Sequence, residues 1–325
     1  MNYRIDTEGE SSNLPPMLAP NKCLAIDIPM EDIVFPKLCS IKYNGIRATT
    51  ATGQWTSRSG KPVRMAPHIQ KMFEPILRHS AENNVVRDGE FNSNTHNTVG
   101  QTMSILAGTI PVPNDFKFKC FYELPNLVWN MIKNVPMGKL MPCEERLPHY
   151  EVVEQRIISS LGEFENLIDL HKNRGIEGFM LLNPNALYKH NPRCTVKEQI
   201  LLKYKYYSDK EDGKVIGLVP RQERRAGVES KTNIFDKAEP VHTKDSFYYT
   251  DIAGCMIVEL EDKSIIHSPF PIGYTLEMRQ KIHNQFGTGL LHDIEGMWIS
   301  FRRLACENRD KPIAIKQVEF RDSKD

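Results

Sequence analysis

Residues 42–47 read KYNGIR and bring together side chains that could do chemistry. Lys42 is a potential nucleophile, Asn44-Gly45 is a turn dipeptide, and Arg47 is a cation two residues further on. Asn-Gly between two β-rich runs is also the strongest short-range signal for a β-hairpin, in which Lys42 would be only a solvated strand residue. By average residue usage, K-x-[DN]-G-x-R arises by chance in roughly one chain of this length in a hundred. The motif alone therefore leaves both interpretations open.

A second group of cations lies in the stretch LLKYKYY. Lys203 and Lys205 alternate there with apolar and aromatic residues, so on a strand both ammonium groups project from one face. Two like charges on one strand face repel each other unless an anion lies between them. An exposed strand face is the alternative. If Lys42 lies close by, the two cations would favour the neutral, nucleophilic form of its amine.

Carboxylates occur where a metal or a ribose could bind. RDGEF places Asp88 and Glu90 on either side of a glycine, and IEGFM places Glu177 before a glycine in an apolar strand. A buried carboxylate is costly unless it binds a cation or finds a partner. A solvated turn explains RDGEF equally well if it stands alone. Combined with the lysines, these carboxylates predict a site where a divalent metal and ammonium groups stabilise the displacement of pyrophosphate.

The elements that must position these residues are mainly short strands. Strands are expected around residues 37–52, with RSG at 58–60 on a neighbouring strand, and at NVVRDGEFNS, FKFKCFYEL, IEGFMLLNP and EQILLKYKYY. In FKFKCFYEL, Phe121 and Tyr122 fall on opposite faces of the alternation. Helical spacing predicts an amphipathic helix over MAPHIQKMFEPILRHSAEN, and further helices over CEERLPHYEVVEQRIISSLG and FENLIDLHKNRG, the last ended by Gly175.

A polar break, SDKEDGK at residues 208–214, precedes a second group of short strands. VIGLV, IAGCMIVEL, SIIHSPF and MWISF predict strands of a small β-barrel, and TLEMRQKIHNQF predicts one helix. We therefore expect an α+β protein with a first domain over residues 1–208, a second over 209–325, and a hinge near Ser208–Asp212.

Bulk properties narrow the class of protein. A chain of 325 residues suits two modest domains, and a net charge of +1 means that any polyanion site depends on local clustering. The N-terminus has no apolar signal region and no apolar run is long enough to span a bilayer, so we expect a cytoplasmic protein. The seven cysteines form no C-x-x-C pair, which indicates reduced thiols and argues against structural zinc (Cys23, Cys39, Cys120, Cys143, Cys194, Cys255 and Cys306).

The order and spacing of the motifs resemble the covalent nucleotidyltransferases, which comprise ATP-dependent DNA ligases, RNA ligases and mRNA capping enzymes. KYNGIR, SRSG, DGEF, CFYELP, IEGFM and LLKYK resemble motifs I, Ia, III, IIIa, IV and V of that superfamily. PPMLAP, the stretch from LYKHNPRC to VIGLV, and VEFRDSKD resemble small ATP-dependent DNA ligases of the bacteriophage type. The resemblance covers most of residues 14–325. It implies an adenylyltransferase domain of ATP-grasp-like antiparallel sheets with helices, followed by an OB-fold barrel.

The resemblance also implies roles for individual residues. Lys42 would carry AMP as a phosphoramidate, and Glu90 would bind the ribose. Phe121 would stack on adenine, with Tyr122 as the alternative. The other implied contacts are with the nucleotide or the 5′-phosphate of a nick (Ile41, Arg47, Arg58), with the metal (Glu177, alongside Glu90), with the AMP phosphate (Lys203, Lys205) and with the pyrophosphate (Arg321, with Lys324).

Two positions depart from the family pattern. Asn44 stands where motif I usually has aspartate, and Ser40 stands where many ligases have a glutamate that reads the adenine amine. Asparagine keeps an oxygen that accepts hydrogen bonds but loses the charge. An RNA ligase, a guanylyltransferase or a non-catalytic nucleic-acid-binding relative therefore stays an alternative, although Glu177-Gly178 differs from the aspartate-glycine usual in capping enzymes.

The resemblance implies ATP and Mg²⁺ or Mn²⁺ as cofactors and nicked double-stranded DNA as the partner. We expect a monomer without membrane contact, in the cytoplasm of a bacterial host if the chain is phage-encoded.

Overall fold

The computed structural model describes residues 14–96, 98–142, 147–172, 174, 176–190, 193–228, 230–235, 238–240, 243–304 and 315–321. Four residues named above, Cys143, Gly175, Cys306 and Lys324, lie outside these ranges. None of the described helices is both long and apolar enough to cross a membrane.

The chain folds as two compact units. Unit 1 comprises Met1–Lys205 and Thr232–Ala238, and unit 2 comprises Tyr206–Lys231 and Glu239–Asp325. The first division lies between Lys205 and Tyr206, whereas the sequence predicted a boundary at 208. The return of Thr232–Ala238 to unit 1 was not expected. There, Ile234 and Phe235 pack against an apolar core, and the Ile234 carbonyl accepts a hydrogen bond from the Arg64 N–H at 2.7 Å.

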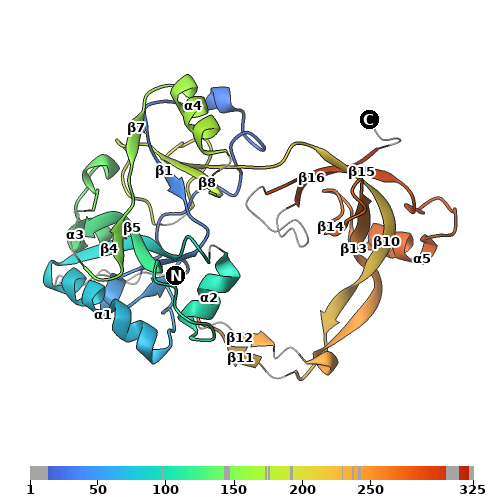
Figure 1. The fold of residues 1–325 in the computed structure, drawn as a ribbon, viewed down its shortest axis with the longest axis horizontal. Coiled ribbons are helices and arrows are strands. Elements are labelled where there is room, and N and C mark those ends of the chain that lie inside the picture. The colour runs from blue at the N-terminus through green and yellow to red at the C-terminus, as the bar shows by residue number, and fades with distance from the viewer. Residues whose placement is uncertain are drawn as a thin grey trace. The chain divides into compact units, whose positions relative to one another are not determined.

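Unit 1 is built on two sheets (Figure 1). The four-stranded sheet has the order β7-β1-β8-β9 and the five-stranded sheet has the order β3-β2-β4-β5-β6, antiparallel except for β5 with β6. The strands are β1 (Lys37–Lys42), β2 (Ile46–Thr49), β3 (Thr56–Ser57), β4 (Val85–Asn92), β5 (Lys117–Pro125), β6 (Tyr150–Val152), β7 (Arg156–Ile158), β8 (Gly178–Leu182) and β9 (Leu201–Lys205). The helices are α1 (Pro67–Glu82), α2 (Val99–Leu106), α3 (Asn126–Trp129) and α4 (Leu161–His171), with 3₁₀ turns at Met30–Asp32, Ala51–Gly53 and Met137–Lys139.

Apolar residues cover both faces of the five-stranded sheet. On one face, side chains of β4 and β5 share a core with Leu38 of β1, Leu182 of β8 and Leu201 of β9. On the other face, Phe91 and Phe118 pack with residues of α1. The five-stranded sheet therefore lies between the four-stranded sheet and α1, and the charged residues of its inner face lie beside the first of these cores.

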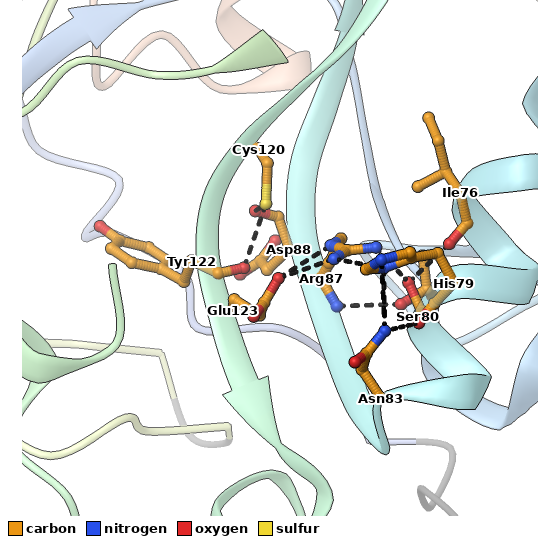
Figure 2. A network of polar contacts seen from close by, with 10 residues as sticks. Ile76, His79, Ser80, Asn83, Arg87, Asp88, Cys120, Tyr122 and Glu123 are labelled. Atoms are coloured by element: carbon orange, nitrogen blue, oxygen red, sulfur yellow. Dashed lines mark hydrogen bonds and ion pairs between the residues drawn. The ribbon is translucent and has the colours of Figure 1, made fainter. Parts of the chain in front are cut away.

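Buried polar contacts fix α1 to the outer face of β4 (Figure 2). Arg87 is fully buried, and its guanidinium donates to Glu123 at 2.9 Å, to Ser80 Oγ at 3.2 Å and to His79 Nδ1 at 3.0 Å. These bonds satisfy a charge that would otherwise be expensive to bury. They tie the C-terminal turns of α1 to the strand that also carries Asp88 and Glu90.

The β-hairpin suggested by Asn44-Gly45 is not formed. β1 pairs with β7 and β8, whereas β2 pairs with β3 and β4, so the two strands that flank the dipeptide belong to different sheets. Neither Asn44 nor Gly45 has a positive φ, which a two-residue hairpin of this kind requires at both positions. Residues 43–45 instead form a link from one sheet to the other.

The helix predicted over CEERLPHYEVVEQRIISSLG is also wrong. Its described part forms β6 and β7, which add to the edges of the two sheets beside β5 and β1. The sequence pattern allowed a helix, but backbone pairing with existing strands decides the conformation. RSG at 58–60, expected on a strand, instead forms the turn that follows β3, where the Gly60 N–H donates to the Ser57 carbonyl at 2.8 Å. The other strand predictions, and the helices α1 and α4, are confirmed.

Unit 2 contains a five-stranded sheet in the order β14-β13-β10-β15-β16, with the helix α5. Its apolar core gathers residues from all five strands and α5, among them Val215, Met256, Ile282 and Phe301. The elements are β10 (Glu211–Arg224), β13 (Phe247–Leu260), β14 (Ile265–Ser268), α5 (Leu276–Gln285), β15 (Trp298–Arg303) and β16 (Ile315–Arg321), with a 3₁₀ turn at Lys244–Ser246. β11 (Ser230–Thr232) and β12 (Ala238–Pro240) form a separate two-stranded ribbon.

The segment expected to act as a hinge, Ser208–Asp212, is fixed within unit 2. The Ser208 N–H donates to the Arg303 carbonyl at 2.7 Å, and the Arg303 N–H donates to Ser208 Oγ at 2.9 Å. Glu211 forms an ion pair with the Arg303 guanidinium. These contacts attach the segment to β15, and a hinge near 208–212 stays a prediction.

Lys37 gives a prediction about stability. Its side chain is 1% exposed, its ammonium donates to the Gln199 carbonyl at 2.6 Å, and burial lowers its pKa from 10.5 to about 8. Between these two pH values the unfolded chain holds a proton that the folded chain does not, so stability rises with pH in this window. Lys37→Met is expected to raise the free energy of unfolding at pH 7 by about 1–3 kcal/mol and to flatten that rise.

Urea denaturation at pH 7 and pH 9.5 measures both effects. Lys71→Met, at an exposed position of α1, is the matched control and should keep the slope of the unmodified protein. An unchanged slope in Lys37→Met would refute the assignment.

Candidate active site

A pocket of about 530 Å³ opens in unit 1 beside the link between β1 and β2. Nine of the ten residues predicted to form the site line it, namely Ile41, Lys42, Arg47, Arg58, Glu90, Phe121, Glu177, Lys203 and Lys205. The tenth, Arg321, lies on β16 of unit 2, where its guanidinium is 3.8 Å from Asp212 Oδ2. Motifs separated by more than 160 residues thus meet at one cavity.

Glu177 lies between two lysines of the pocket. One carboxylate oxygen contacts the Lys42 ammonium and the other accepts from Lys205 Nζ at 2.6 Å. The Glu177 side chain is only 4% exposed, so its charge depends on these partners. The predicted group of cations therefore includes a carboxylate, which removes most of the repulsion between Lys42 and Lys205.

The backbone beside Glu177 requires glycine. Gly178 has a φ of +155°, and a Cβ there would lie 2.0 Å from the Tyr204 carbonyl oxygen. This close approach pairs Gly178 with Lys205 on β9 and with Lys42 on β1. One residue thereby sets the separation of the two lysines and the carboxylate between them.

Lys203 completes the cationic side of the pocket. Burial lowers its pKa, and the positive charges of Lys205 and Lys42 act in the same direction, while Cys23 opposes them. Lys203 also lies two residues from Lys205 along β9, as the alternation predicted. An anionic group that entered the pocket would reduce the mutual repulsion of these ammonium groups.

Arg47 is oriented by Asp88, a partner that the sequence did not identify. Arg47 Nε and one terminal nitrogen donate to the two Asp88 oxygens at 2.9 and 2.6 Å. Asp88 is fully buried and also accepts from the Tyr188 hydroxyl at 2.6 Å. Burial acts to lower the pKa of Arg47, but the charge of Asp88 and its hydrogen bonds outweigh it and raise the pKa. The guanidinium lies 5.8 Å from the centroid of the Phe121 ring, which fixes it at the pocket wall.

Glu90 and Gly45 hold the link between the two sheets. Glu90 Oε1 accepts from the Gly45 N–H at 2.5 Å. Burial raises the pKa of Glu90, whereas Lys42 and this N–H lower it. A Cβ on Gly45 would lie 2.1 Å from the Phe91 carbonyl oxygen. Glycine is therefore needed here for close approach to β4, and not for a hairpin turn.

Gly45→Ala is expected to destabilise unit 1 by about 1–3 kcal/mol, because the added methyl group would push β2 away from the β4 backbone. Thermal unfolding and urea denaturation measure the loss. Gly100→Ala is the control, since Gly100 lies in α2 with nothing within 4 Å of its added Cβ, and it should be neutral or slightly stabilising. Equal stability of the two variants would contradict the close contact.

A β-bulge bears on the choice between Phe121 and Tyr122. On β4 and β5, Asp88 pairs with Tyr122 but Gly89 pairs with Cys120, so Phe121 is the extra residue. A bulge disturbs the alternation of faces and re-aims a side chain, and both aromatic residues line the pocket. Phe121 is half-buried with Arg47 over its ring, whereas Tyr122 is 5% exposed and belongs to the core between the sheets. The geometry favours Phe121 as the ring that meets a ligand.

Two residues that line the pocket, Arg193 and Phe235, were not predicted from the sequence. Arg193 lines the pocket and donates to the Ala19 carbonyl at 2.5 Å, and Phe235 reaches the pocket from Thr232–Ala238. Arg193 falls inside the stretch LYKHNPRC, which resembles DNA ligases, but the resemblance gave it no role, and no motif includes Phe235. Asn44 and Ser40, the two departures from the family pattern, also line the pocket.

No family model and no curated protein sequence matches the chain. Solved structures do match. One from a structure–function study of Lig E DNA ligases has a TM-score of 0.56 at 18% identity, covering 94% of this chain and 99% of that one. Another, described as Pmar-Lig_Pre, has a TM-score of 0.53 at 16% identity, covering 90% of this chain and 64% of that one.

These likenesses establish the fold. The chain has the α+β architecture of a nucleotidyltransferase domain followed by an OB-fold. More narrowly, the fold is similar to that of the structure from the Lig E DNA ligase study, as the motif resemblance implied.

Proposed function

We propose that the chain is an ATP-dependent DNA ligase that seals nicks between a 5′-phosphate and a 3′-hydroxyl in duplex DNA. One observation carries the proposal: Lys42 shares a single pocket with Lys203, Lys205, Arg47 and Glu177. The DNA ligase fold supports it. We expect the protein to act as a monomer in the cytoplasm.

The first chemical step is assigned to Lys42. Its neutral amine attacks the α-phosphorus of ATP, a P–N bond forms, the bond from the α-phosphorus to the bridging oxygen breaks, and pyrophosphate leaves. Before attack the ammonium must lose a proton, and the Glu177 carboxylate is in direct contact with it. Lys203 and Lys205 line the same pocket, and neutralising the α-phosphate is their proposed role.

The later steps transfer the AMP group. An oxygen of the 5′-phosphate at the nick displaces Lys42 from the phosphorus, giving a DNA-adenylate joined by a P–O–P bridge. The 3′-hydroxyl then attacks the 5′-phosphorus, forms the phosphodiester and releases AMP. Arg47, held by Asp88 at the pocket wall, and Arg58 on the loop after β3 are the proposed contacts for these phosphates.

Glu90 and Glu177 are the proposed metal ligands. The described residues contain no group of three or more His, Cys, Asp or Glu side chains that could hold a metal alone. Mg²⁺, however, is commonly bound by one or two carboxylates together with the phosphates of a nucleotide, and the buried Glu177 and the half-buried Glu90, which both line the pocket, fit that role. When bound, the ion would neutralise charge that develops on the phosphates.

Labelling with α-³²P-ATP and Mg²⁺ tests the proposal. The wild type should acquire a covalent label that is stable in denaturing gels, and Lys42→Ala should acquire none. Lys197→Ala, on an exposed loop, should label as the wild type does. An unlabelled wild type would refute the enzyme and leave the non-catalytic relative, whereas a label that survives Lys42→Ala would refute Lys42 as the nucleophile.

Two further experiments distinguish a DNA ligase from a guanylyltransferase and from an RNA ligase. Labelling by GTP in place of ATP would favour a guanylyltransferase. Sealing of nicks with DNA/DNA, DNA/RNA and RNA/RNA strands ranks the substrates, and we expect the DNA/DNA nick to be sealed fastest. Faster sealing of RNA ends would identify an RNA ligase instead.

A further inference from the structure

Tyr43, the residue after the proposed nucleophile, lies against a buried cation. Lys119 Nζ is 4.1 Å from the centroid of the Tyr43 ring, well within the distance at which an ammonium group is attracted to an aromatic face. Lys119 is 2% exposed and lies on β5, where it pairs with Glu90 of the neighbouring strand β4. No motif in the sequence pointed to this contact.

The Lys119 ammonium is held in place by other groups. Its Nζ donates to Asn94 Oδ1 at 2.9 Å and lies 3.7 Å from Glu151 Oε1 on β6. Burial lowers the pKa of Lys119, while Glu151 and Asp115 raise it. Since water is largely excluded, the attraction between this cation and the Tyr43 ring is screened little.

Tyr43 is placed to transmit this restraint to Lys42. It lies in the link of residues 43–45, which belongs to no strand, so no ladder of backbone hydrogen bonds fixes it. The Lys42 ammonium donates to the Tyr43 carbonyl at 3.2 Å. Burial and the nearby carboxylates of Glu151 and Glu90 raise the pKa of the Tyr43 hydroxyl to about 12, so the ring stays a neutral phenol near pH 7.

We propose that Lys119 is a positioning residue for Lys42, acting through a cation–π contact with Tyr43. The contact fixes the ring, the ring fixes the link between the two sheets, and the link holds the amine where it meets the α-phosphate. The inference rests on the proposed adenylation by Lys42. Lys119 itself touches no reacting atom.

Graded fluorination of residue 43 tests the contact. Phenylalanine and its mono-, di- and trifluorinated analogues are incorporated at position 43, since each fluorine weakens the negative face of the ring with little change in shape. The single-turnover rate of lysyl-AMP formation at saturating ATP should fall steadily from Tyr43→Phe to the trifluoro variant, by roughly three- to thirtyfold in total. The Kd for ATP and the Tm should stay constant across the series.

Variants of Lys119 provide the matched arm. In a Lys119→Met background the dependence on fluorine should vanish, and Lys119→Arg should restore part of the rate. Lys117→Met is the control, because Lys117 also pairs with Glu151, at 3.0 Å, but is 39% exposed; its rate should equal that of the wild type. A flat fluorine series, or one that persists without Lys119, would overturn the inference while leaving the proposed function intact. A wild type without any label would instead refute the proposed function.

Discussion

Glu177→Gln is expected to reduce the rate of covalent AMP labelling at least about 10²-fold. The substitution keeps the shape of the side chain but removes the charge that contacts both Lys42 and Lys205. Two ammonium groups would then face each other without a carboxylate between them, and Lys42 would lose the nearest acceptor for its proton. Because both lysines remain about one-fifth exposed, water can solvate them, and the loss of stability should stay below about 2 kcal/mol.

Single-turnover labelling with α-³²P-ATP and urea denaturation measure the two effects separately. Glu198→Gln is the control, since it makes the same change in the ion pair of Glu198 with Lys189. Its labelling rate should stay within about twofold of the wild type, and its free energy of unfolding should change by less than about 1 kcal/mol. Full labelling by Glu177→Gln would show that neither the ion pairs nor a carboxylate ligand at this position matters for adenylation.

Asp88→Asn is expected to lower the free energy of unfolding by about 3–5 kcal/mol, the largest loss of stability that we predict. The Asp88 carboxylate is fully buried and neutralises Arg47, whose side chain is 17% exposed. It also accepts from Tyr188, whose hydroxyl in turn accepts the Met17 N–H at 3.0 Å. Losing this charge leaves a largely buried cation without its counter-charge and loosens the start of the described chain. Urea denaturation measures the effect.

A double variant distinguishes an effect on stability from an effect on adenylation. Replacing both partners, as in Arg47→Met with Asp88→Asn, should recover part of the stability, because no unpaired guanidinium remains. Adenylation should stay low in the double variant, since the proposed phosphate contact is gone. Tyr188→Phe, which removes one hydrogen bond, should cost only about 1 kcal/mol. If Asp88→Asn were no worse than Tyr188→Phe, Asp88 would not be the main counter-charge of Arg47.

Most of the predicted site residues line the pocket, because the motifs consist of residue types that a chemical role requires, whatever the local conformation. Lys42, Glu177, Lys203 and Lys205 are polar residues in or beside apolar strands, where burial must be balanced by a partner or a ligand. Their spacing, matched to a family pattern, was enough to bring them to one pocket. Their roles in catalysis stay predictions until labelling is measured.

The partners of these residues could not be predicted in the same way. Asp88 on β4 contacts Arg47 on the neighbouring strand β2. Lys119 on β5 contacts Tyr43, which lies in the link between the two sheets. Such pairs depend on strand order and register, which the order of residues along the chain does not show. The bulge at Phe121 is a further case, because it breaks the alternation on which the choice between Phe121 and Tyr122 rested.

The hairpin alternative and the wrongly predicted helix fail for a common reason. Asn44-Gly45 has strong local turn chemistry, and CEERLPHYEVVEQRIISSLG has a pattern compatible with a helix, yet both give way to strand pairing with distant segments. Local signals decide a conformation only where no stronger tertiary contact competes for the same backbone groups.

Unit 1 is a discontinuous domain, and this limits how the protein can be divided. A fragment that ends at residue 208 would lack Phe235, which lines the pocket, and Ile234, whose carbonyl binds the Arg64 N–H. The apolar surface that these two side chains cover would be left in water. A self-sufficient catalytic fragment therefore has to retain Thr232–Ala238 through a short bridge in place of residues 206–231, and truncation alone should give a protein that labels poorly and aggregates.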